Sequence, residues 1–189
     1  MRIALDVMGA DAGPLEMIQG GVQAAEANPD TEVVLVGDSA AIEQALEAHP
    51  PSSSARLSVH HASEIIGMDE SPGKAVRRKA DSSLCQAVDL TARHETDAVV
   101  SPGNTGAVVA AALLHSMGLL EGVKRPGIAV TIHNPAGGGP STLMDCGATL
   151  DCKAVHLCQF AVMASIYQTH VFKVDSPTVG VLSVGEEST

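Results

Sequence analysis

The chain has 189 residues, of which 45% are hydrophobic and 17% charged, and this composition fits a globular protein with its own core. Its net charge of −11 argues against a nucleic-acid-binding protein, because nucleic-acid backbones require a basic surface. Four cysteines are too few for a disulfide scaffold, and Asp6 falls where a signal peptide requires an apolar run. No apolar run reaches the length of a membrane span, so we expect a cytoplasmic protein.

Short runs typical of β-strands alternate with longer helical patterns along the chain. The expected strands are residues 3–7, 32–36, 56–60, 98–101, 128–132, 143–146 and 179–184. The expected helices are residues 14–27, 39–48, 82–94, 105–117 and 153–171. This alternation predicts one α/β domain over residues 1–189, Rossmann-like, with a mainly parallel, doubly wound sheet and helices on both faces. Ligands of such sheets bind at the carboxyl ends of the strands, in the loops that lead into helices.

The first loop of this kind follows the expected strand 3–7 and ends at Pro14. Gly9 and Asp11 lie in this loop, and Asp6 lies near the end of the strand before it. The two acids are candidates to position a hydroxyl group, a metal or a basic partner. The alternative for Asp11 is a purely structural role as the cap of the helix that Pro14 begins.

A second loop carries a concentration of positive charge. Four of the eleven basic residues lie within six positions, at Lys74, Arg77, Arg78 and Lys79, and Ser82 follows them. Arginine binds phosphate oxygens in pairs and lysine supplies a point charge, so we expect an anion site rather than a solvated basic face. The segment lacks the glycine and the Ser/Thr that a P-loop requires.

The strongest local pattern is the segment from Ser101 to Gly106, which joins an expected strand to an Ala-rich helix. Gly103 and Gly106 allow the backbone to turn tightly and to approach a ligand, and free N–H groups at a helix start favour an anion. Asn104 and Thr105 add polar side chains. The alternative is a helix cap in a tight turn.

The remaining candidates lie between residues 133 and 158. Residues 133–140 indicate a hairpin or lid, with His133 as the best-placed catalytic histidine and a structural or merely exposed histidine as the alternative. Asp145 lies at an expected strand end, and Gly147 follows it. Cys152 and His156 have the spacing of metal ligands on one helical face, but we favour buried thiols and expect no metal. There is no dinucleotide fingerprint and no nucleophile elbow, and we expect no cofactor.

Taken together, these motifs resemble the bacterial acyl-acyl carrier protein:phosphate acyltransferases. The matching motifs are Asp6-Val7-Met8-Gly9-Ala10-Asp11, Val76-Arg77-Arg78-Lys79 with Ser82-Ser83, Gly103-Asn104-Thr105-Gly106, Met144-Asp145-Cys146-Gly147-Ala148, Gln159-Phe160-Ala161 with Met163, and residues 179–187. The first loop departs from the family pattern, because Ala10 replaces a glycine and Ala12-Gly13 replace a His-Ala pair. Family members continue beyond residue 187 with a second lobe, so the resemblance implies the N-terminal portion of a longer protein.

The resemblance implies transfer of a fatty acyl group from acyl carrier protein to inorganic phosphate, giving acyl phosphate for phospholipid synthesis. It also implies a homodimer and a position at the inner face of the membrane through the downstream acyltransferase. On this hypothesis Asn104 and Thr105 with Gly103 and Gly106 hold the phosphate or the oxyanion. The remaining site residues neutralise charge, donate hydrogen bonds or shape the pocket: Arg77, Arg78, Lys79, Ser82, Asp6, Gly9, Asp11, Ser101, Asp145 and Gly147. The alternatives are a phosphate acetyltransferase-like enzyme that uses acyl-coenzyme A, and an inactive fragment that only associates with a partner.

Overall fold

The computed structural model describes residues 1–135, 137, 139–149 and 151–182. It divides into two compact units, Met1–Gly118 and Leu119–Thr189. Each unit is described by itself, and a single domain over residues 1–189 stays a prediction.

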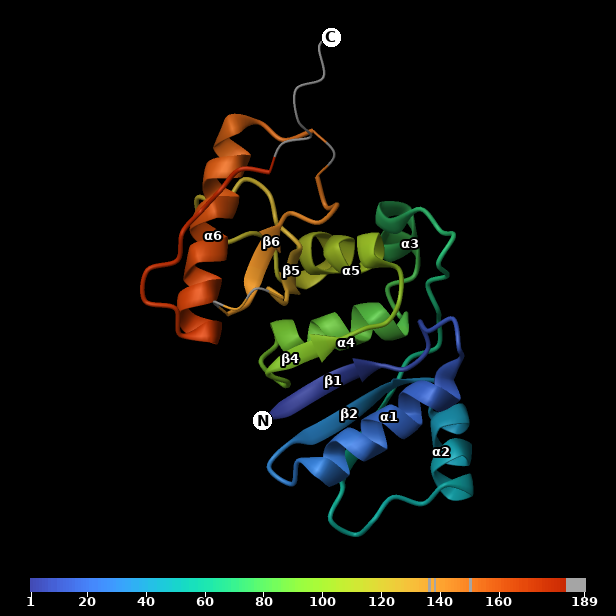
Figure 1. Ribbon diagram of the computed structural model, residues 1–189. Coiled ribbons are helices and arrows are strands. Elements are labelled where there is room, and N and C mark those ends of the chain that lie inside the picture. Colours follow the sequence, from blue (N-terminus) through green and yellow to red (C-terminus); the bar gives the residue numbers. More distant parts are fainter. Residues whose placement is uncertain (136, 138, 150, 183–189) are drawn as a thin grey trace. The chain divides into compact units, whose positions relative to one another are not determined.

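The first unit alternates strands and helices (Figure 1). Its elements are β1 (Arg2–Asp6), α1 (Pro14–Ala27), β2 (Glu32–Gly37), α2 (Ser39–Ala48), β3 (Arg56–His61), α3 (Pro72–Arg78), α4 (Ser83–Ala92), β4 (Ala98–Val100), α5 (Thr105–Ala111) and the π-helical turn η1 (Ala112–Ser116). Helix α3 corrects the expectation of a basic loop. Pro72 stands at its start, where a missing N–H is no loss, and Arg77 and Arg78 lie in its last turn, where cations favour the helix dipole.

The four strands form one parallel sheet in the order β3-β2-β1-β4. Strand β2 pairs with one side of β1 and β3 pairs with β2, whereas β4 pairs with the other side of β1. The strand order therefore reverses between β1 and β4, which is the position where ligands bind in sheets of this type. The predicted parallel α/β fold is confirmed for this unit.

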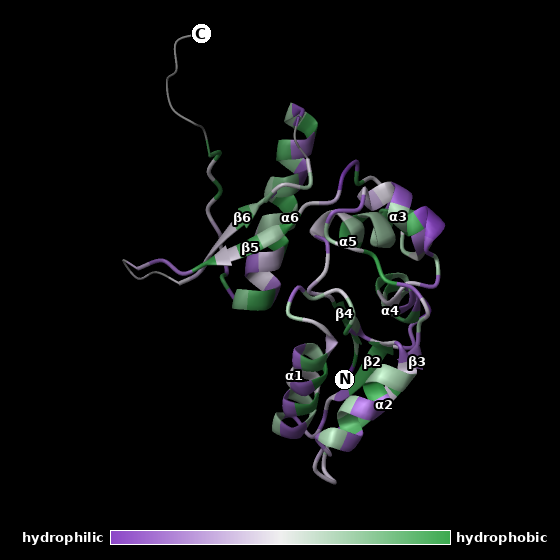
Figure 2. Ribbon diagram, turned by 90° about the vertical axis from the view of Figure 1, so that its right-hand side faces the viewer, coloured by the Kyte–Doolittle hydropathy of each residue, from purple (hydrophilic) through white to green (hydrophobic). Residues whose placement is uncertain are grey.

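Helices cover both faces of the sheet, as a doubly wound fold requires. On one face Leu5 and Leu35 pack with Ile18 of α1 and Ile42 of α2. The cluster on the other face, which α4 covers, consists of Ala4, Val34, Val36, Ala62, Ala87 and Leu90. Figure 2 shows β2 as hydrophobic, whereas α1 alternates between hydrophobic and hydrophilic residues. Strand β2 is thus buried from both sides.

Two adjacent glycines of α1 differ in their surroundings, and we expect opposite effects when each is replaced by alanine. A Cβ at Gly20 has nothing within 4 Å, so Gly20→Ala should stabilise the chain by up to about 1 kcal/mol through helix propensity. A Cβ at Gly21 comes within 2.9 Å of the buried side chains of Leu5 and Leu35, so Gly21→Ala should cost roughly 1–3 kcal/mol. Urea unfolding of both variants measures the difference, and equal effects would contradict this account of α1 packing.

The second unit contains a hairpin and one long helix. Strands β5 (Ala129–Ile132) and β6 (Ser141–Met144) pair in antiparallel fashion, which confirms the expected hairpin, and α6 (Ala154–Phe172) follows. Gln168 of α6 donates to the carbonyl oxygen of Pro140 at 3.1 Å and to Thr142 Oγ1 at 2.8 Å. The expected strand 179–184 is wrong for residues 179–182, which form no strand, and its last two residues lie outside the described part.

Helix α6 also carries apolar side chains on its exposed side. Val155, Val162 and Ile166 are each about half exposed, while Phe160 is buried.

Among the described residues, none of the helices has the length and apolar character that a membrane span requires.

Candidate functional site

The candidate site lies at the reversal point between β1 and β4. We call the two segments that leave these strands, residues 7–13 and 101–104, the switch-point loops. Ser101 Oγ donates to Asp6 Oδ2 at 2.7 Å, and the backbone N–H of Met8 donates to Asp6 Oδ1 at 3.2 Å. Asp6 is 1% exposed, so its buried carboxylate links the two loops through hydrogen bonds and is not open to solvent.

The backbones of the two loops nearly touch at two glycines. A Cβ built on Gly9 lies 3.0 Å from the Cα of Gly103 and 3.0 Å from Asp6 Oδ2. Any larger residue at position 9 would push the loops apart. The N–H of Gly103 donates to Ser101 Oγ at 3.1 Å, so Ser101 joins both loops.

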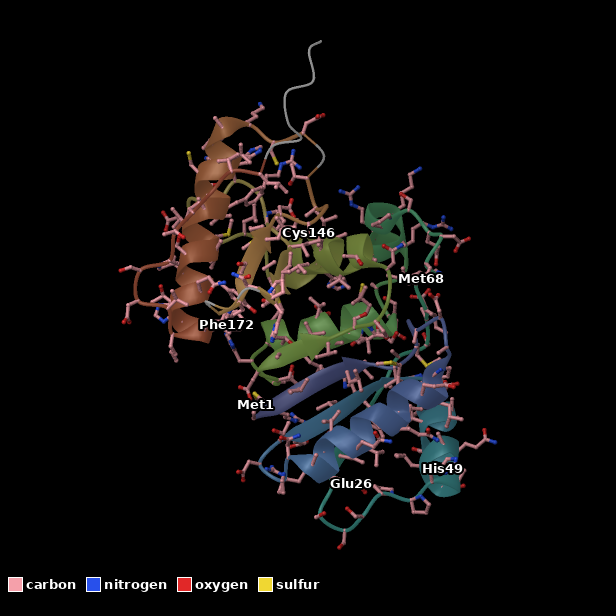
Figure 3. The ribbon with its side chains drawn as sticks, viewed as in Figure 1. Met1, Glu26, His49, Met68, Cys146 and Phe172 are labelled. Carbon is pink, nitrogen blue, oxygen red and sulfur yellow. The ribbon has the colours of Figure 1, made fainter. Side chains whose placement is uncertain are left out.

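Asn104 uses its whole side-chain amide to fix the start of α5. Its Oδ1 accepts from the N–H of Ala107 at 3.0 Å, which caps the helix. Its Nδ2 donates to the carbonyl oxygens of Met68 at 3.0 Å and of Glu70 at 3.2 Å. Met68, labelled in Figure 3, belongs to the segment between β3 and α3. The cap that the sequence left as an alternative is therefore present.

The groups beside Asn104 face outward. Thr105 and Gly106 are exposed, and no described residue accepts a hydrogen bond from their backbone N–H groups. A Cβ on Gly106 would lie 2.7 Å from Cγ of Pro72, so the start of α3 packs against the start of α5. Two N–H donors and a hydroxyl thus stand together at the end of the sheet where an anion is expected.

The basic residues in and directly after α3 differ in whether their side chains bind other residues of the chain. Lys79 Nζ donates to Glu70 Oε1 at 2.5 Å and to the carbonyl oxygen of Ile65 at 2.6 Å. The hydrogen bond from Lys79 holds the pKa of Glu70 below its ordinary value. The side chains of Arg77 and Arg78 are exposed and form no hydrogen bond or ion pair with the described residues. Arg77 and Arg78, like the exposed Lys74, keep their charged groups in solvent, and a role of any of these cations in ligand binding stays a prediction.

Two further expected site residues lie elsewhere in the first unit. Ser82 is completely buried and accepts from the N–H of Cys85 at 3.3 Å as the cap of α4, so its hydroxyl serves the helix start here, and its expected role as a phosphate donor stays a prediction. Asp11 is exposed and the residue at the cap of α1 is Gly13, so the helix-cap alternative for Asp11 is also wrong.

The remaining candidates belong to the second unit. Asp145 Oδ1 accepts from the N–H groups of Ile128 at 2.9 Å and Ala148 at 3.1 Å, and Gly147 follows with a positive φ of 107°. Asp145 therefore holds the turn after β6, beside Cys146, which Figure 3 labels. His133 is exposed. A role of Asp145 and Gly147 in substrate binding stays a prediction.

The structure gives no support for a metal at the cysteine–histidine pair. His156 Nδ1 accepts from the N–H of Lys153 at 3.2 Å and caps α6, and no group of three or more metal-ligating side chains is found in the described residues. The expectation of a buried thiol is wrong for Cys152, which is exposed. Cys85 is buried, and this burial raises the pKa of its thiol.

Asp81 gives a prediction for acid stability. Ser63 donates to Asp81 Oδ2 from its hydroxyl at 2.5 Å and from its N–H at 3.1 Å, and these bonds hold the pKa of Asp81 below the ordinary 3.8. The stabilisation is therefore present above pH 3.8 and is lost as the pH falls through the lowered pKa. We expect the urea midpoint of Asp81→Asn to fall less than that of the parent between pH 7 and pH 3, and parallel pH profiles would contradict the assignment.

With this geometry in place, comparison with known proteins identifies the family. The family model described as "Fatty acid synthesis protein" matches residues 1–189. The chain belongs to this family. A protein from Myxococcus xanthus named "Phosphate acyltransferase" is 48% identical over 189 residues, which are 100% of this chain and 52% of the relative. Another of the same name from Alkalilimnicola ehrlichii is 43% identical over 187 residues, 99% of this chain and 54% of the relative.

This chain spans about half the length of the curated relatives it matches. Among solved structures, a phosphotransacetylase from Streptococcus pyogenes superposes with a TM-score of 0.66 and 18% identity, covering 93% of this chain and 55% of that one. At this identity the likeness shows the fold alone. The membership confirms the resemblance predicted from the motifs.

Sequence reasoning placed Asp6, Gly9, Ser101 and Gly103 at or after strand ends, and the structure brings these four residues together. Their role in ligand binding stays a prediction. Sequence reasoning missed Glu70, whose ion pair with Lys79 and backbone contact with Asn104 have no signature in a linear pattern.

Proposed function

We propose that this chain supplies the phosphate-binding part of an acyltransferase that moves a fatty acyl group from acyl-acyl carrier protein to inorganic phosphate. The product would be acyl phosphate for phospholipid synthesis. Membership of the fatty acid synthesis family and the names of the relatives support the reaction class. The observation that carries the site is the meeting of the switch-point loops at Gly9 and Gly103, beside the outward N–H groups of α5.

The chemistry asks for position and charge neutralisation more than for a strong base. Phosphate is largely ionised near neutral pH and can attack the thioester carbonyl directly. The leaving thiol has an ordinary pKa of about 8.5 and departs as a thiolate without strong acid assistance. The enzyme must orient the two reactants and donate hydrogen bonds to the oxyanion of the tetrahedral intermediate. Glycine loops and a helix start meet that requirement.

Each residue then has a role in this proposal. The N–H groups of Thr105 and Gly106, with the Thr105 hydroxyl, bind phosphate or the oxyanion. Arg77 and Arg78 neutralise phosphate or contact the acidic carrier protein. Asp6, Ser101 and Asn104 hold the loops in place.

A second candidate is an enzyme that uses acyl-coenzyme A, as favoured by the fold shared with the phosphotransacetylase. Both reactions use phosphate as the acceptor, so the loops fit either one. The two differ in the donor, because carrier protein needs a docking surface and coenzyme A a nucleotide site.

The test is an assay of the purified chain with phosphate and either acyl-acyl carrier protein or acyl-coenzyme A. Hydroxylamine traps any acyl phosphate as the hydroxamate, and the full-length M. xanthus relative serves as the comparison enzyme. We expect phosphate binding by the chain and product only with the carrier-protein donor. Product with acyl-coenzyme A alone selects the second candidate. A chain that neither binds phosphate nor forms product refutes both and leaves a non-catalytic, associating role.

The proposal extends to the surroundings of the enzyme. It includes acyl carrier protein as partner, a homodimer, and a cytoplasmic site of action beside the membrane-bound acyltransferase that uses the product. A sizing column and a carrier-protein binding assay test the first two.

A further inference from the structure

The turn from Gly67 to Glu70, between β3 and α3, is closed by one carboxylate. The N–H of Glu70 donates to the carbonyl oxygen of Gly67 at 3.3 Å, and the N–H of Gly67 donates back to Glu70 Oε1 at 2.8 Å. The same Oε1 accepts from Lys79 Nζ at 2.5 Å, and Lys79 also bonds Ile65. Glu70 therefore joins the turn to the far end of α3.

This turn also holds the start of α5. The two carbonyl oxygens that accept hydrogen bonds from Asn104 Nδ2 belong to Met68 and Glu70, which are the second and the last residue of the turn. Asn104 in turn caps α5 through the N–H of Ala107. A displacement of the turn would be passed to Asn104 and from there to the N–H groups of Thr105 and Gly106.

We propose that Glu70 is a positioning residue for anion binding at the start of α5, acting through Asn104. The inference rests on the proposed phosphate site. Glu70 touches no substrate in this assignment, and neither does Lys79, whose ammonium group holds the carboxylate in place. The ion pair is about one-third exposed on both sides, so its contribution to global stability is small and its effect is local.

The rival account makes Lys79 a direct phosphate ligand and Glu70 its competitor. The two accounts predict opposite signs for Glu70→Gln. If Lys79 binds phosphate, the substitution releases the ammonium group and removes a nearby negative charge, so phosphate binds more tightly. If Glu70 positions the loop, the substitution loosens the turn, and phosphate binds about tenfold more weakly even though a negative charge has gone.

The experiment is a titration of the chain with inorganic phosphate, followed by ³¹P NMR or calorimetry, for the parent, Glu70→Gln, Glu70→Asp and Lys79→Gln. Glu47→Gln on the exposed side of α2 is the matched control for loss of a charge. We expect similar losses for Glu70→Gln and Lys79→Gln, partial recovery with Glu70→Asp, and no change for the control. Thermal melting confirms that each variant is folded.

A second readout, the NMR resonances of the Asn104 side-chain amide, separates the two levels of the proposal. Phosphate binding that is equal or tighter in Glu70→Gln overturns the positioning role and leaves the proposed function standing. Failure of the parent to bind phosphate refutes the proposed function. In that case the resonances of the Asn104 side-chain amide alone show whether Glu70 is coupled to Asn104. An Asn104 amide unchanged in Glu70→Gln overturns the coupling in either case.

Discussion

Replacing Gly9 by alanine is expected to lower phosphate-dependent acyl transfer, or phosphate binding by this chain, by roughly tenfold. The added Cβ would lie 3.0 Å from the Cα of Gly103, a backbone atom that cannot rotate away. The loops must separate by a few tenths of an ångström. A misplacement of about 1 Å can cost on the order of 10²-fold in rate, so this smaller shift should cost roughly tenfold. Phosphate titration and the hydroxamate assay measure the effect.

Gly20→Ala is the matched control, because a Cβ there meets nothing within 4 Å. Thermal melting of Gly9→Ala should show a folded protein, since the two loops contribute little to the hydrophobic core. Phosphate affinity that stays at the parental level would show that the close approach of the loops is not needed for binding.

Leu35→Ala is expected to give the largest loss of stability, about 2–5 kcal/mol. Leu35 is 0% exposed at the centre of the sheet and belongs to the cluster that α1 and α2 cover. Typical domains are stable by roughly 5–15 kcal/mol, so this single change removes a large share of the total. Urea unfolding gives the free energy of unfolding, and Leu15→Ala, at a position 42% exposed on α1, should change it by no more than about 0.5 kcal/mol. Comparable losses in both variants would contradict the assigned core.

The parallel sheet could be predicted because its strands are short apolar runs between clear helix patterns. Strand β2, with four consecutive valine and leucine residues, and α1, with Pro14 at its start, are examples. Helix α3 was missed because its three cations and Gly73 obscure the pattern of a short helix, which tertiary packing stabilises through Ala75 and Val76. The strand expected at residues 179–184 fails over its first four residues, where no described strand pairs with it.

The candidate site also has residues that could be predicted from the sequence and residues that could not. Asp6, Gly9, Ser101 and Gly103 could be named in advance, because strand ends and glycines are visible in a sequence. The buried state of Ser82 and the engagement of Lys79 could not, since both depend on which partners the fold brings near. Residue type alone does not distinguish a side chain that caps a helix or forms an ion pair from one that binds a ligand.

The hydrogen bond between Asp6 and Ser101 joins residues 95 positions apart. Strands β1, β2 and β3 follow one another closely along the chain, so they can pair while the rest is still being synthesised, since chains fold from the N-terminus during synthesis. The switch-point loops cannot meet until β4, a strand of only three residues, has paired with the side of β1 that faces away from β2. Partly folded molecules would therefore hold a native-like sheet without an anion site. During refolding, recovery of phosphate binding should lag behind recovery of helical circular dichroism.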